Sequence, residues 1–549
     1  MAASEILAPP EGRPAGGDTP AAGWRSLSAR SVLPAVLALT VLGAIPRVIV
    51  AHQSVFADEL STYWISATHS LGDVLSLLYS SGRIQHAEIT PPLSFLLSWL
   101  TTRAGHSPEL LRLPALLAGT ATIPLVYLLG RKTVGARAGL LAAAVTAFSP
   151  FMIYYSAEAR AYGLMMFFAG CAVLCLMAAL DSGRRRYWVL YAVFSAAAFY
   201  THYTCLFVLA VAGVWALWFE RAARRSVLLA NLGAALLVVP WIPGLIADLR
   251  SPTVSILSQL SPFTAQAVRI DIQHWALGYP YTVAGGLDKL PGVPSLLLLA
   301  AVLAVTVIGL AIRARHEDWT AAWGRPGAIL SRGYPHRRVL LIVLLMLATP
   351  VGEIIGSALG NHIIGVRDLA ASWPYLALTG AAVVVAAGPR FGAAAAALAV
   401  IAFALSVPKM LEAHFQRPNY QAAADYVAAR ARAGDVVVDV TGALSPGPLT
   451  GFDVSYHGRP LPVFRARSPQ EHDHPYTVFD PIVPLATAVD GAVRTARGNQ
   501  VFLVTPVLTP NGRPVLRYPD GYRLTAHRRY PGIQPTDVDV YSRAPGAGQ

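Results

Sequence analysis

Long apolar runs dominate the first 408 residues and most strongly constrain how this chain can fold. A helix needs about 20 apolar residues to cross a bilayer. Only 13% of the 549 residues are charged and 54% are hydrophobic, whereas a soluble domain carries about 25% charged residues. The composition therefore predicts a polytopic α-helical membrane protein. About 11 runs are long enough to span, and they lie near 32–52, 110–130, 138–157, 162–180, 187–202, 203–220, 226–247, 293–313, 339–358, 369–388 and 391–408.

Basic residues concentrate in short loops between these runs, and they predict the orientation of the chain. Arg131-Lys132, Arg184-Arg185-Arg186 and the stretch from Arg313 to Arg338 belong on the cytoplasmic side by the positive-inside rule. The rule also accounts for the net charge of +13, so the predicted partner is the lipid bilayer and not nucleic acid. Segment 91–104 is too short to cross and is interpreted as a juxtamembrane or re-entrant helix on the outer surface.

The composition divides the chain into three parts. Residues 1–30 are rich in Ala, Pro, Gly and Arg and are predicted to form a disordered cytoplasmic tail. Residues 31–408 form the predicted transmembrane domain, which contains a long first outer loop at 53–109. Residues 409–549 are polar and are predicted to fold outside the membrane. The protein is thus expected to be a multi-pass plasma-membrane protein with a cytoplasmic N-terminus and an extracytoplasmic C-terminal domain.

The polar C-terminal region carries alternating signals of helix and strand. Residues 420–433 read as a helix, and 435–440 and 501–504 read as strands rich in Val. The stretch 454–484 reads as a loop. The sequence therefore predicts a small α/β domain.

Two adjacent carboxylates, Asp58 and Glu59, follow the first apolar run where a helix emerges into water. Acidic residues at a membrane boundary are costly unless they are paired, hydrated or used. Asp58 is therefore a candidate general base, although it also suits the N-cap of a helix that follows it. Glu59 is a candidate catalytic residue that orients a substrate, or a first-turn acid favoured by the helix dipole.

Other ionisable residues fall at the predicted outer ends of spans. Glu158 and Arg160 lie in one outer turn, where they would contribute to a site or form a structural ion pair. Arg112 and Arg367 are candidate phosphate-binding residues, because a guanidinium group matches phosphate bidentately. The alternatives are anchoring of Arg112 at the lipid headgroups and pairing of Arg367 with Asp368.

Three aromatic or imidazole side chains complete the candidate site. His202 and Tyr203 project from a tight outer turn, and Tyr155 lies near the outer end of its span. They are candidate substrate-binding residues, although a lone His is more often structural and outer aromatics also form a membrane belt. Residues 471–474 read Glu-His-Asp-His, but the spacing is not that of a zinc site and a solvated loop is favoured. No metal-binding residue is predicted.

An ordered set of short motifs across residues 30–210 resembles the GT-C superfamily of membrane glycosyltransferases, specifically the PMT/ArnT-like group (family 39 and its relatives). The motifs are Phe56-Ala57-Asp58-Glu59, Thr90-Pro91-Pro92-Leu93, Leu111-Arg112-Leu113-Pro114, Leu129-Gly130-Arg131-Lys132, Ser149-Pro150-Phe151, Tyr155-Ser156-Ala157-Glu158-Ala159-Arg160-Ala161-Tyr162-Gly163 and Tyr200-Thr201-His202-Tyr203.

The resemblance implies a GT-C-like fold and transfer of a sugar from a polyprenyl-phosphate donor to an extracytoplasmic acceptor hydroxyl. It also implies that an acidic residue of the first outer loop is the general base, and this position maps onto Asp58. The Arg-Tyr pair common near a late span of the family reads Arg367-Asp368 here.

We therefore expect an inverting hexosyl- or pentosyltransferase whose acceptor is an envelope glycan, lipid or protein. The Ala- and Arg-rich composition fits a GC-rich genome, so mannose and arabinose are the sugars considered first. No cofactor is predicted, and a divalent metal stays open. Two alternatives come from other classes: a transporter or flippase of a lipid-linked sugar, and a non-catalytic envelope scaffold. A transporter favours inverted repeats and broken helices at the membrane midplane, and neither is evident.

Overall fold

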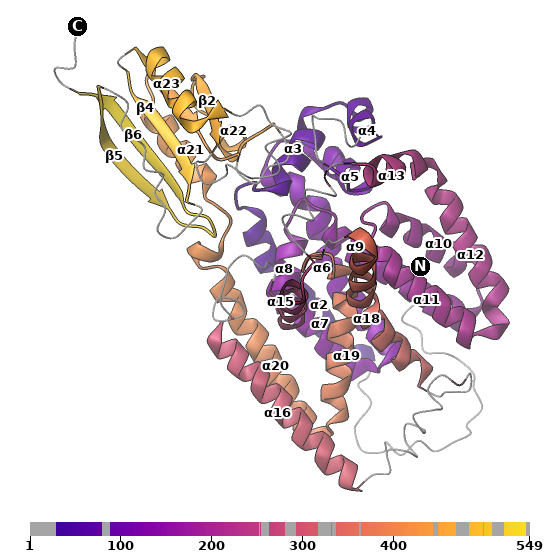
Figure 1. Ribbon diagram of the computed structural model, residues 1–549. Helices are drawn as coiled ribbons and strands as arrows, with labels where there is room; N and C mark the ends of the chain where they lie inside the picture. Colours follow the sequence, from indigo (N-terminus) through magenta and orange to yellow (C-terminus); the bar gives the residue numbers. More distant parts are fainter. Residues whose placement is uncertain are drawn as a thin grey trace.

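The computed structural model shows a helical body that carries a separate α/β domain at one end (Figure 1). It describes residues 29–79, 88–251, 253, 263–279, 292–316, 331, 336–361, 364–442, 448–467, 483–497, 499–507 and 521–544. The predicted tail at 1–28 and the acidic-histidine run at 471–474 lie outside these residues. The fold is that of a polytopic α-helical membrane protein with a C-terminal α/β domain, as the sequence predicts.

The helical body begins with α2 and ends with α20. Its α-helices are α2 (Ala29–Ala51), α3 (Asp58–Thr68), α4 (Leu71–Tyr79), α5 (Leu93–Thr102), α6 (Pro108–Thr133), α7 (Ala136–Phe148), α8 (Pro150–Ser156), α9 (Tyr162–Ser182), α10 (Arg185–Phe199), α11 (Cys205–Phe219), α12 (Arg224–Val238), α13 (Ile242–Leu249), α15 (Ala265–Leu277), α16 (Val293–His316), α18 (Arg337–Gly356), α19 (Trp373–Ala386) and α20 (Pro389–Met410). Short 3-10 or π turns extend several of them: η1 (Arg221–Ala223), η2 (Val239–Trp241), η4 (Ser357–Asn361), η5 (Ala370–Ser372) and, after α20, η6 (Ala413–Phe415).

Every predicted apolar run coincides with one of these helices or with two consecutive ones, but the lengths of the helices differ. Within the described part of the chain, seven helices are long and apolar enough to cross a membrane, or eight if the bent pair α7–α8 is one span. That pair bends by 63° between Phe148 and Pro150. Helices α10 and α11 have 15 residues each and α19 has 14. The number of about 11 crossings therefore stays a prediction.

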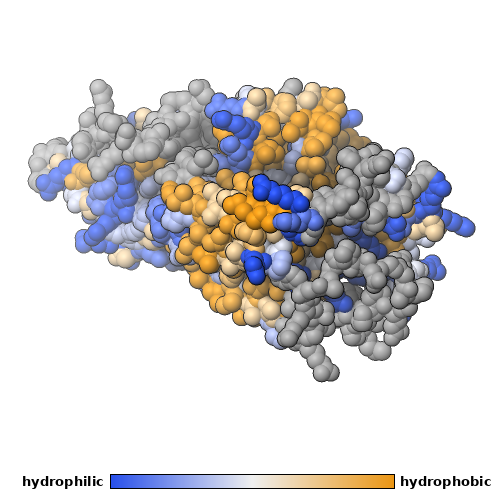
Figure 2. All heavy atoms as spheres, turned by 90° about the horizontal axis from the view of Figure 1, so that it is seen from below, coloured by the Kyte–Doolittle hydropathy of each residue, from blue (hydrophilic) through white to orange (hydrophobic). Residues whose placement is uncertain are grey.

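The outer surfaces of several long helices are apolar, as a lipid environment requires. Exposed side chains cover α12 and α16, among them Leu228, Leu232, Leu236, Leu297 and Leu303, which are 55–67% exposed. Figure 2 shows broad apolar areas of this kind on the face seen from below. Exposed apolar patches of this extent are not found on ordinary soluble monomers.

Small residues let the central helices approach closely. Gly130 of α6 faces the backbone of Gly139 of α7 and the side chain of Leu378 of α19, and no Cβ fits in that space. Close backbone contact through glycine is a recurring device of membrane helices, because no hydrophobic effect drives them together in lipid.

The segment predicted to be the first outer loop contains, in its described residues, three short helices, α3, α4 and α5, that lie over the end of the body. The amphipathic segment from Leu71 forms α4, and it buries Val74 and Leu78. The short apolar segment at 91–104 forms α5, which packs on α3 and α6. Ser66 and Ser98 donate to the carbonyl oxygens of Phe95 and Leu111 at 3.1 and 3.0 Å, so these polar side chains join the layers.

The C-terminal domain, called the outer domain after the side of the membrane predicted for it, contains in its described residues a sheet of six strands with helices on both faces. Its elements are α21 (Tyr420–Arg430), β1 (Val436–Asp439), α22 (Gly451–Ser455), β2 (Val463–Arg467), β3 (Val483–Pro484), α23 (Leu485–Ala496), β4 (Val501–Pro506), β5 (Tyr522–Tyr530) and β6 (Thr536–Arg543). The strand order is β3-β2-β1-β4-β6-β5. Strands β3, β2, β1 and β4 are parallel, and β6 runs antiparallel to both of its neighbours, β4 and β5.

The central strand β1 is buried on both faces, which explains its unbroken run of Val. Val436 and Val438 pack with α23, and Val437 packs with α21. The predicted helix and both predicted strands are present. The prediction of a loop over 454–484 is wrong, because α22 overlaps its start and β2 and β3 lie within it. Strand β2 forms by pairing with β1, a long-range contact that local sequence does not encode.

The contact between α6 and α7 generates a stability prediction. We expect Gly130→Ala to lower the melting temperature of the full chain in detergent by several degrees, because its Cβ meets backbone atoms. Gly380→Ala in α19 is the matched control, because no atom lies within 4 Å of its added Cβ. Alanine is also the better helix former by about 1 kcal/mol. Equal melting temperatures for the two variants would contradict the prediction.

Candidate active site

A buried ion pair joins α3 to α6 and holds the loop before α3. Arg112 is fully buried, and its Nε and Nη2 donate to Glu59 Oε1 and Oε2 at 2.8 and 2.6 Å. The same guanidinium donates to the backbone carbonyl oxygens of Ala51, Gln53 and Ser54. Every nitrogen of Arg112 is therefore engaged by the protein.

Glu59 is equally enclosed. It is 1% exposed, and Oε1 also accepts from the backbone N–H of Ala159 at 2.7 Å. Arg417 Nε lies 3.3 Å from Oε2. Burial opposes ionisation of Glu59, but Arg112 and Arg417 outweigh that cost and hold its pKa below the usual value. These contacts favour a structural role for Glu59 and Arg112. The catalytic role of Glu59 and the phosphate-binding role of Arg112 stay predictions.

Asp58 begins α3 and lies at the surface of this cluster. Its Oδ2 accepts a hydrogen bond of 2.6 Å from Arg367 Nη1, and the two side chains are 19% and 38% exposed. Ala57, immediately before it, has φ 51° and ψ −127°. A non-glycine residue with positive φ is strained by about 1–3 kcal/mol, and such residues cluster at functional sites. The predicted N-cap role of Asp58 is not observed, since it is the first helical residue.

The charge state of Asp58 is set by its two arginine neighbours. Burial disfavours the carboxylate, but the charges of Arg367 and Arg160 overcome that effect and lower its pKa below the usual value. Asp58 is therefore ionised at neutral pH and able to accept a proton. Arg367 pairs with Asp58 here, whereas the sequence offered Asp368 or a ligand phosphate as its partner.

Arg160 supports Asp58 from the buried side. Its Nη1 and Nη2 donate to Glu88 at 2.8 and 3.1 Å, and Nη1 lies 3.5 Å from the carbonyl oxygen of Asp58. Thr62 and Thr90 accept further bonds at 3.3 Å. Sequence reasoning missed Glu88, although its position two residues before the Thr90-Pro91-Pro92 motif was a usable signal.

Glu158 lies among the same charged groups without an equivalent partner. Its Oε2 is buried and accepts no hydrogen bond from the residues that the structure describes. Burial raises the pKa of Glu158 to about 7, and the charges of Glu59 and Asp58 raise it while those of Arg417 and Arg367 lower it. Tyr155 and Tyr162 are close enough to interact electrostatically with this carboxyl group.

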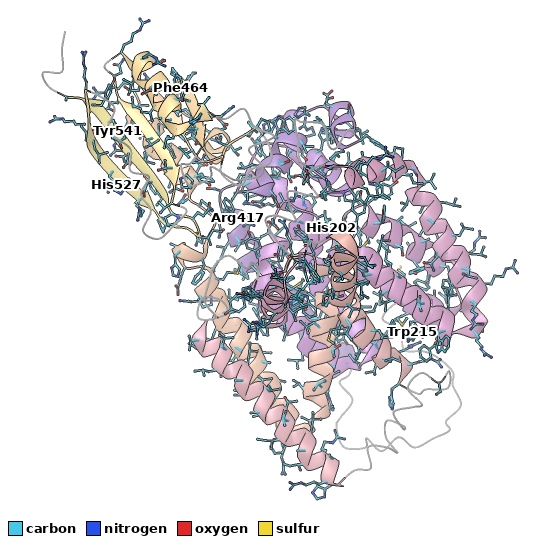
Figure 3. All side chains as sticks on the ribbon, viewed as in Figure 1. His202, Trp215, Arg417, Phe464, His527 and Tyr541 are labelled. Carbon is cyan, nitrogen blue, oxygen red and sulfur yellow. The ribbon has the colours of Figure 1, made fainter. Side chains whose placement is uncertain are left out.

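The predicted aromatic residues divide into two groups. Tyr155 is buried under the site, with its ring 4.7 to 5.3 Å from those of Phe151, Tyr154 and Tyr162. His202 lies 5.4 Å from the Tyr162 ring and is labelled at the centre of Figure 3. The hydroxyl of Tyr203 instead contacts Asp248 and Trp241 near α13, outside the cluster around Asp58. A substrate-binding role for Tyr203 therefore has no support from this geometry.

Two further acidic residues, Asp368 and Asp271, lie close to Arg367 or to each other. Burial raises the pKa of Asp368, with Arg367 opposing and Asp58 reinforcing that shift. Burial also raises the pKa of Asp271 of α15 to about 7, and Asp368 adds to it. Among the described residues, no group of three or more His, Cys, Asp or Glu side chains is arranged to hold a metal ion.

One segment of the chain matches a known protein family. Residues 89–244 match the family described as dolichyl-phosphate-mannose-protein mannosyltransferase. Over that segment, the match agrees with the resemblance to PMT-like proteins that the motifs indicate. The matched segment includes Arg112, Glu158, Arg160 and His202, and Asp58 lies before it. No curated protein matches the chain.

Three solved structures show how distant the similar chains are. ArnT from Cupriavidus metallidurans bound to undecaprenyl phosphate is 14% identical, with 95% of this chain and 100% of that chain covered and a TM-score of 0.44. An oligosaccharyltransferase of Archaeoglobus fulgidus, tethered to an acceptor peptide, is 12% identical, with 86% and 69% covered and a TM-score of 0.48. Arabinofuranosyltransferase AftD from Mycobacteria is 16% identical, with 94% and 42% covered and a TM-score of 0.38. Likeness at this level carries no conclusion about activity. The family match is what supports the general assignment, a membrane glycosyltransferase.

The buried pair predicts separate roles for the two adjacent acids. Glu59→Ala leaves Arg112 buried and without its carboxylate, which costs about 3–5 kcal/mol in comparable sites. We expect this variant to unfold at a markedly lower temperature in detergent, while Asp58→Asn stays close to the wild type. A stable Glu59→Ala protein would show that the pair does not hold the loop.

The raised pKa of Glu158 predicts a pH-dependent stability. Because the folded pKa of about 7 lies above the ordinary 4.5, the folded chain holds this proton more tightly than the unfolded chain. The resulting stabilisation is complete below pH 4.5 and is lost as the pH rises through 7. We expect Glu158→Gln to flatten the fall in melting temperature between about pH 4.5, the ordinary pKa, and about pH 8, roughly one unit above the folded pKa. Parallel curves for the variant and the wild type would contradict this prediction.

Proposed function

We propose that this protein transfers a sugar from a polyprenyl-phosphate donor to an acceptor hydroxyl on the extracytoplasmic side, with inversion at the anomeric carbon. The observation that carries the proposal is the contact between Asp58 and Arg367 at the rim of the buried cluster. It brings an ionised carboxylate and an accessible guanidinium together at the outer end of the helical body. A base for the acceptor and a cation for a phosphate are the two groups that this reaction needs.

The proposed reaction is a single displacement. Asp58 takes the proton from the acceptor hydroxyl while that oxygen attacks the anomeric carbon of the donor. The bond between this carbon and the phosphate oxygen breaks, and the electron pair leaves with the polyprenyl phosphate. Arg367 stabilises the developing charge on the phosphate, since a guanidinium binds two phosphate oxygens in parallel.

The ion pair also offers a reason why the base acts only when the donor is present. While Arg367 binds Asp58, its charge lowers the pKa of the carboxylate and weakens it as a base. A donor phosphate competes for the same guanidinium. Transfer of Arg367 to the phosphate would free Asp58 and raise its pKa, which strengthens the base at the moment when the sugar is in place.

The remaining residues are assigned supporting roles. Arg160 keeps Asp58 ionised and is itself held by Glu88, so it is proposed to act through Asp58 and not as a direct phosphate ligand. Glu158, Tyr155 and His202 are proposed to shape the sugar pocket. The acceptor is proposed to be an envelope glycan, lipid or protein. The N-terminus is proposed to be cytoplasmic and residues 409–549 extracytoplasmic.

Transfer from a panel of radiolabelled polyprenyl-phosphate sugars to membrane acceptors tests this proposal. We expect the purified wild type to transfer one of them, and Asp58→Asn to be slower by about 10²- to 10⁴-fold, the contribution typical of a general base. Arg367→Ala is expected to raise the KM for the donor as well as to lower kcat.

Asp73→Asn is the matched control for this assay. Asp73 is an exposed aspartate of the same outer loop and accepts its hydrogen bond, 2.6 Å long, from Ser70. The activity of Asp73→Asn should equal that of the wild type. Full activity of Asp58→Asn would remove Asp58 as the base. Failure of the wild type with every donor would reject the transferase and favour a transporter or a scaffold.

A further inference from the structure

The outer domain reaches the candidate active site through Arg417, a residue that the sequence did not single out. Arg417 lies in the segment that connects α20 to the outer domain and is 3% exposed. Figure 3 labels it at the junction between the helical body and the sheet. Its Nε lies 3.3 Å from Glu59 Oε2, and its guanidinium carbon lies 4.6 Å from the centre of the Tyr154 ring. One side chain thus contacts both the buried pair and the aromatic floor of the site.

The loop that precedes Asp58 is held from two sides. On the inner side, Arg112 binds the carbonyl oxygens of Gln53 and Ser54. On the outer side, the Gln53 side chain accepts from the backbone N–H of Arg417 at 3.0 Å, and Ser54 Oγ accepts from that of Gln421 at 3.1 Å. The loop is therefore the layer between the helical body and the outer domain.

Apolar contacts extend the same junction. The rings of Phe56 and Tyr420 lie 6.4 Å apart. Val454 of α22 packs against a cluster that includes Val55, Leu60 and Ala159. Both residues from the outer domain therefore touch the segment that ends in Asp58.

We propose that the outer domain is a working part of the transfer site, and that Arg417 is the positioning residue through which the docking of this domain sets the place of Asp58. This inference rests on the proposed function for its consequence in catalysis. Its structural part is that Arg417 orders the loop at 53–57. This part can be tested by hydrogen exchange, which needs no enzymatic activity.

The balance of charge explains why this position requires an arginine. Three carboxylates, those of Asp58, Glu59 and Glu158, are gathered within one cluster. Arg112 is committed to Glu59 and the loop carbonyls, and Arg367 to Asp58. Arg417 is a further cation that acts on both Glu59 and Glu158. Its planar guanidinium can stack on Tyr154 while it pairs with Glu59, which an ammonium group cannot do equally well.

The experiment uses the full chain with Arg417→Gln, Arg417→Lys and a control, Arg430→Gln. Arg430 is exposed at the far end of α21, where its guanidinium carbon lies 3.9 Å from the centre of the Tyr426 ring, so it matches the ring contact of Arg417 away from the junction. Hydrogen exchange of the backbone amides at 53–60 and the pH profile of transfer are measured on the monodisperse protein.

We expect Arg417→Gln to speed exchange at 53–60 and to lower kcat by up to about 100-fold, as small displacements of reacting groups do. The step in the pH profile that follows ionisation of Glu158 should move to higher pH, because this carboxyl group loses the nearby charge of Arg417. The other groups that act on Glu158 are unchanged: Glu59, Asp58, Arg367, Tyr155 and Tyr162. Arg417→Lys should retain the position of that step but show faster exchange. It also serves as the second variant if Arg417→Gln does not fold.

The outcomes separate this inference from the proposed function. If the wild type transfers no sugar, the proposed function fails, and faster exchange in Arg417→Gln alone still supports the positioning role. Unchanged exchange and kcat in both Arg417 variants would overturn the inference while leaving the transferase intact. An equal rise in hydrogen exchange at 53–60 and an equal fall in kcat in Arg430→Gln would overturn it too, since they would reflect general destabilisation of the outer domain.

Discussion

The buried pair between Glu59 and Arg112 is the interaction on which the geometry of the candidate site depends. Arg112 does more than neutralise Glu59, because it also donates to three backbone carbonyl oxygens at the end of α2 and in the loop beyond it. A buried ion pair adds little net stability, but removal of one partner is costly. Its value here is positional: it fixes where α3 begins, and therefore where Asp58 stands.

Adjacent acids acquire opposite environments because a helix turns by about 100° per residue. Glu59 points into the protein, where two arginines and a backbone N–H enclose it. Asp58, one residue earlier, points to the rim and meets the half-exposed Arg367. The same local sequence thus supplies one buried structural carboxylate and one partly accessible carboxylate. This division gives a physical basis for assigning the chemistry to only one of the two residues.

The outer domain is joined to the helical body through the loop that carries Asp58. Its connecting segment contributes Arg417, and the first turn of α21 contributes Gln421 and Tyr420. A domain that only tethered an acceptor would not need contacts at this depth. The fold of that domain is a common α/β arrangement, so its contribution is argued from these contacts and not from its architecture.

The sequence alone was sufficient for the class of the fold and for most of the candidate site. Apolar runs report spans because backbone groups must be satisfied within lipid, and the Val-rich strands report burial on both faces of a sheet. The motifs brought Asp58, Glu158, Arg160 and Arg367 into one hypothesis, and the structure places them near one another. Tertiary structure decided the rest. The partners of Arg112 and Glu59, the distance of Tyr203 from the cluster, the formation of β2 and the reach of Arg417 all arise between segments far apart in the chain. Such contacts depend on how helices and strands pack in space, and short-range patterns of hydrophobicity and charge contain no record of that packing.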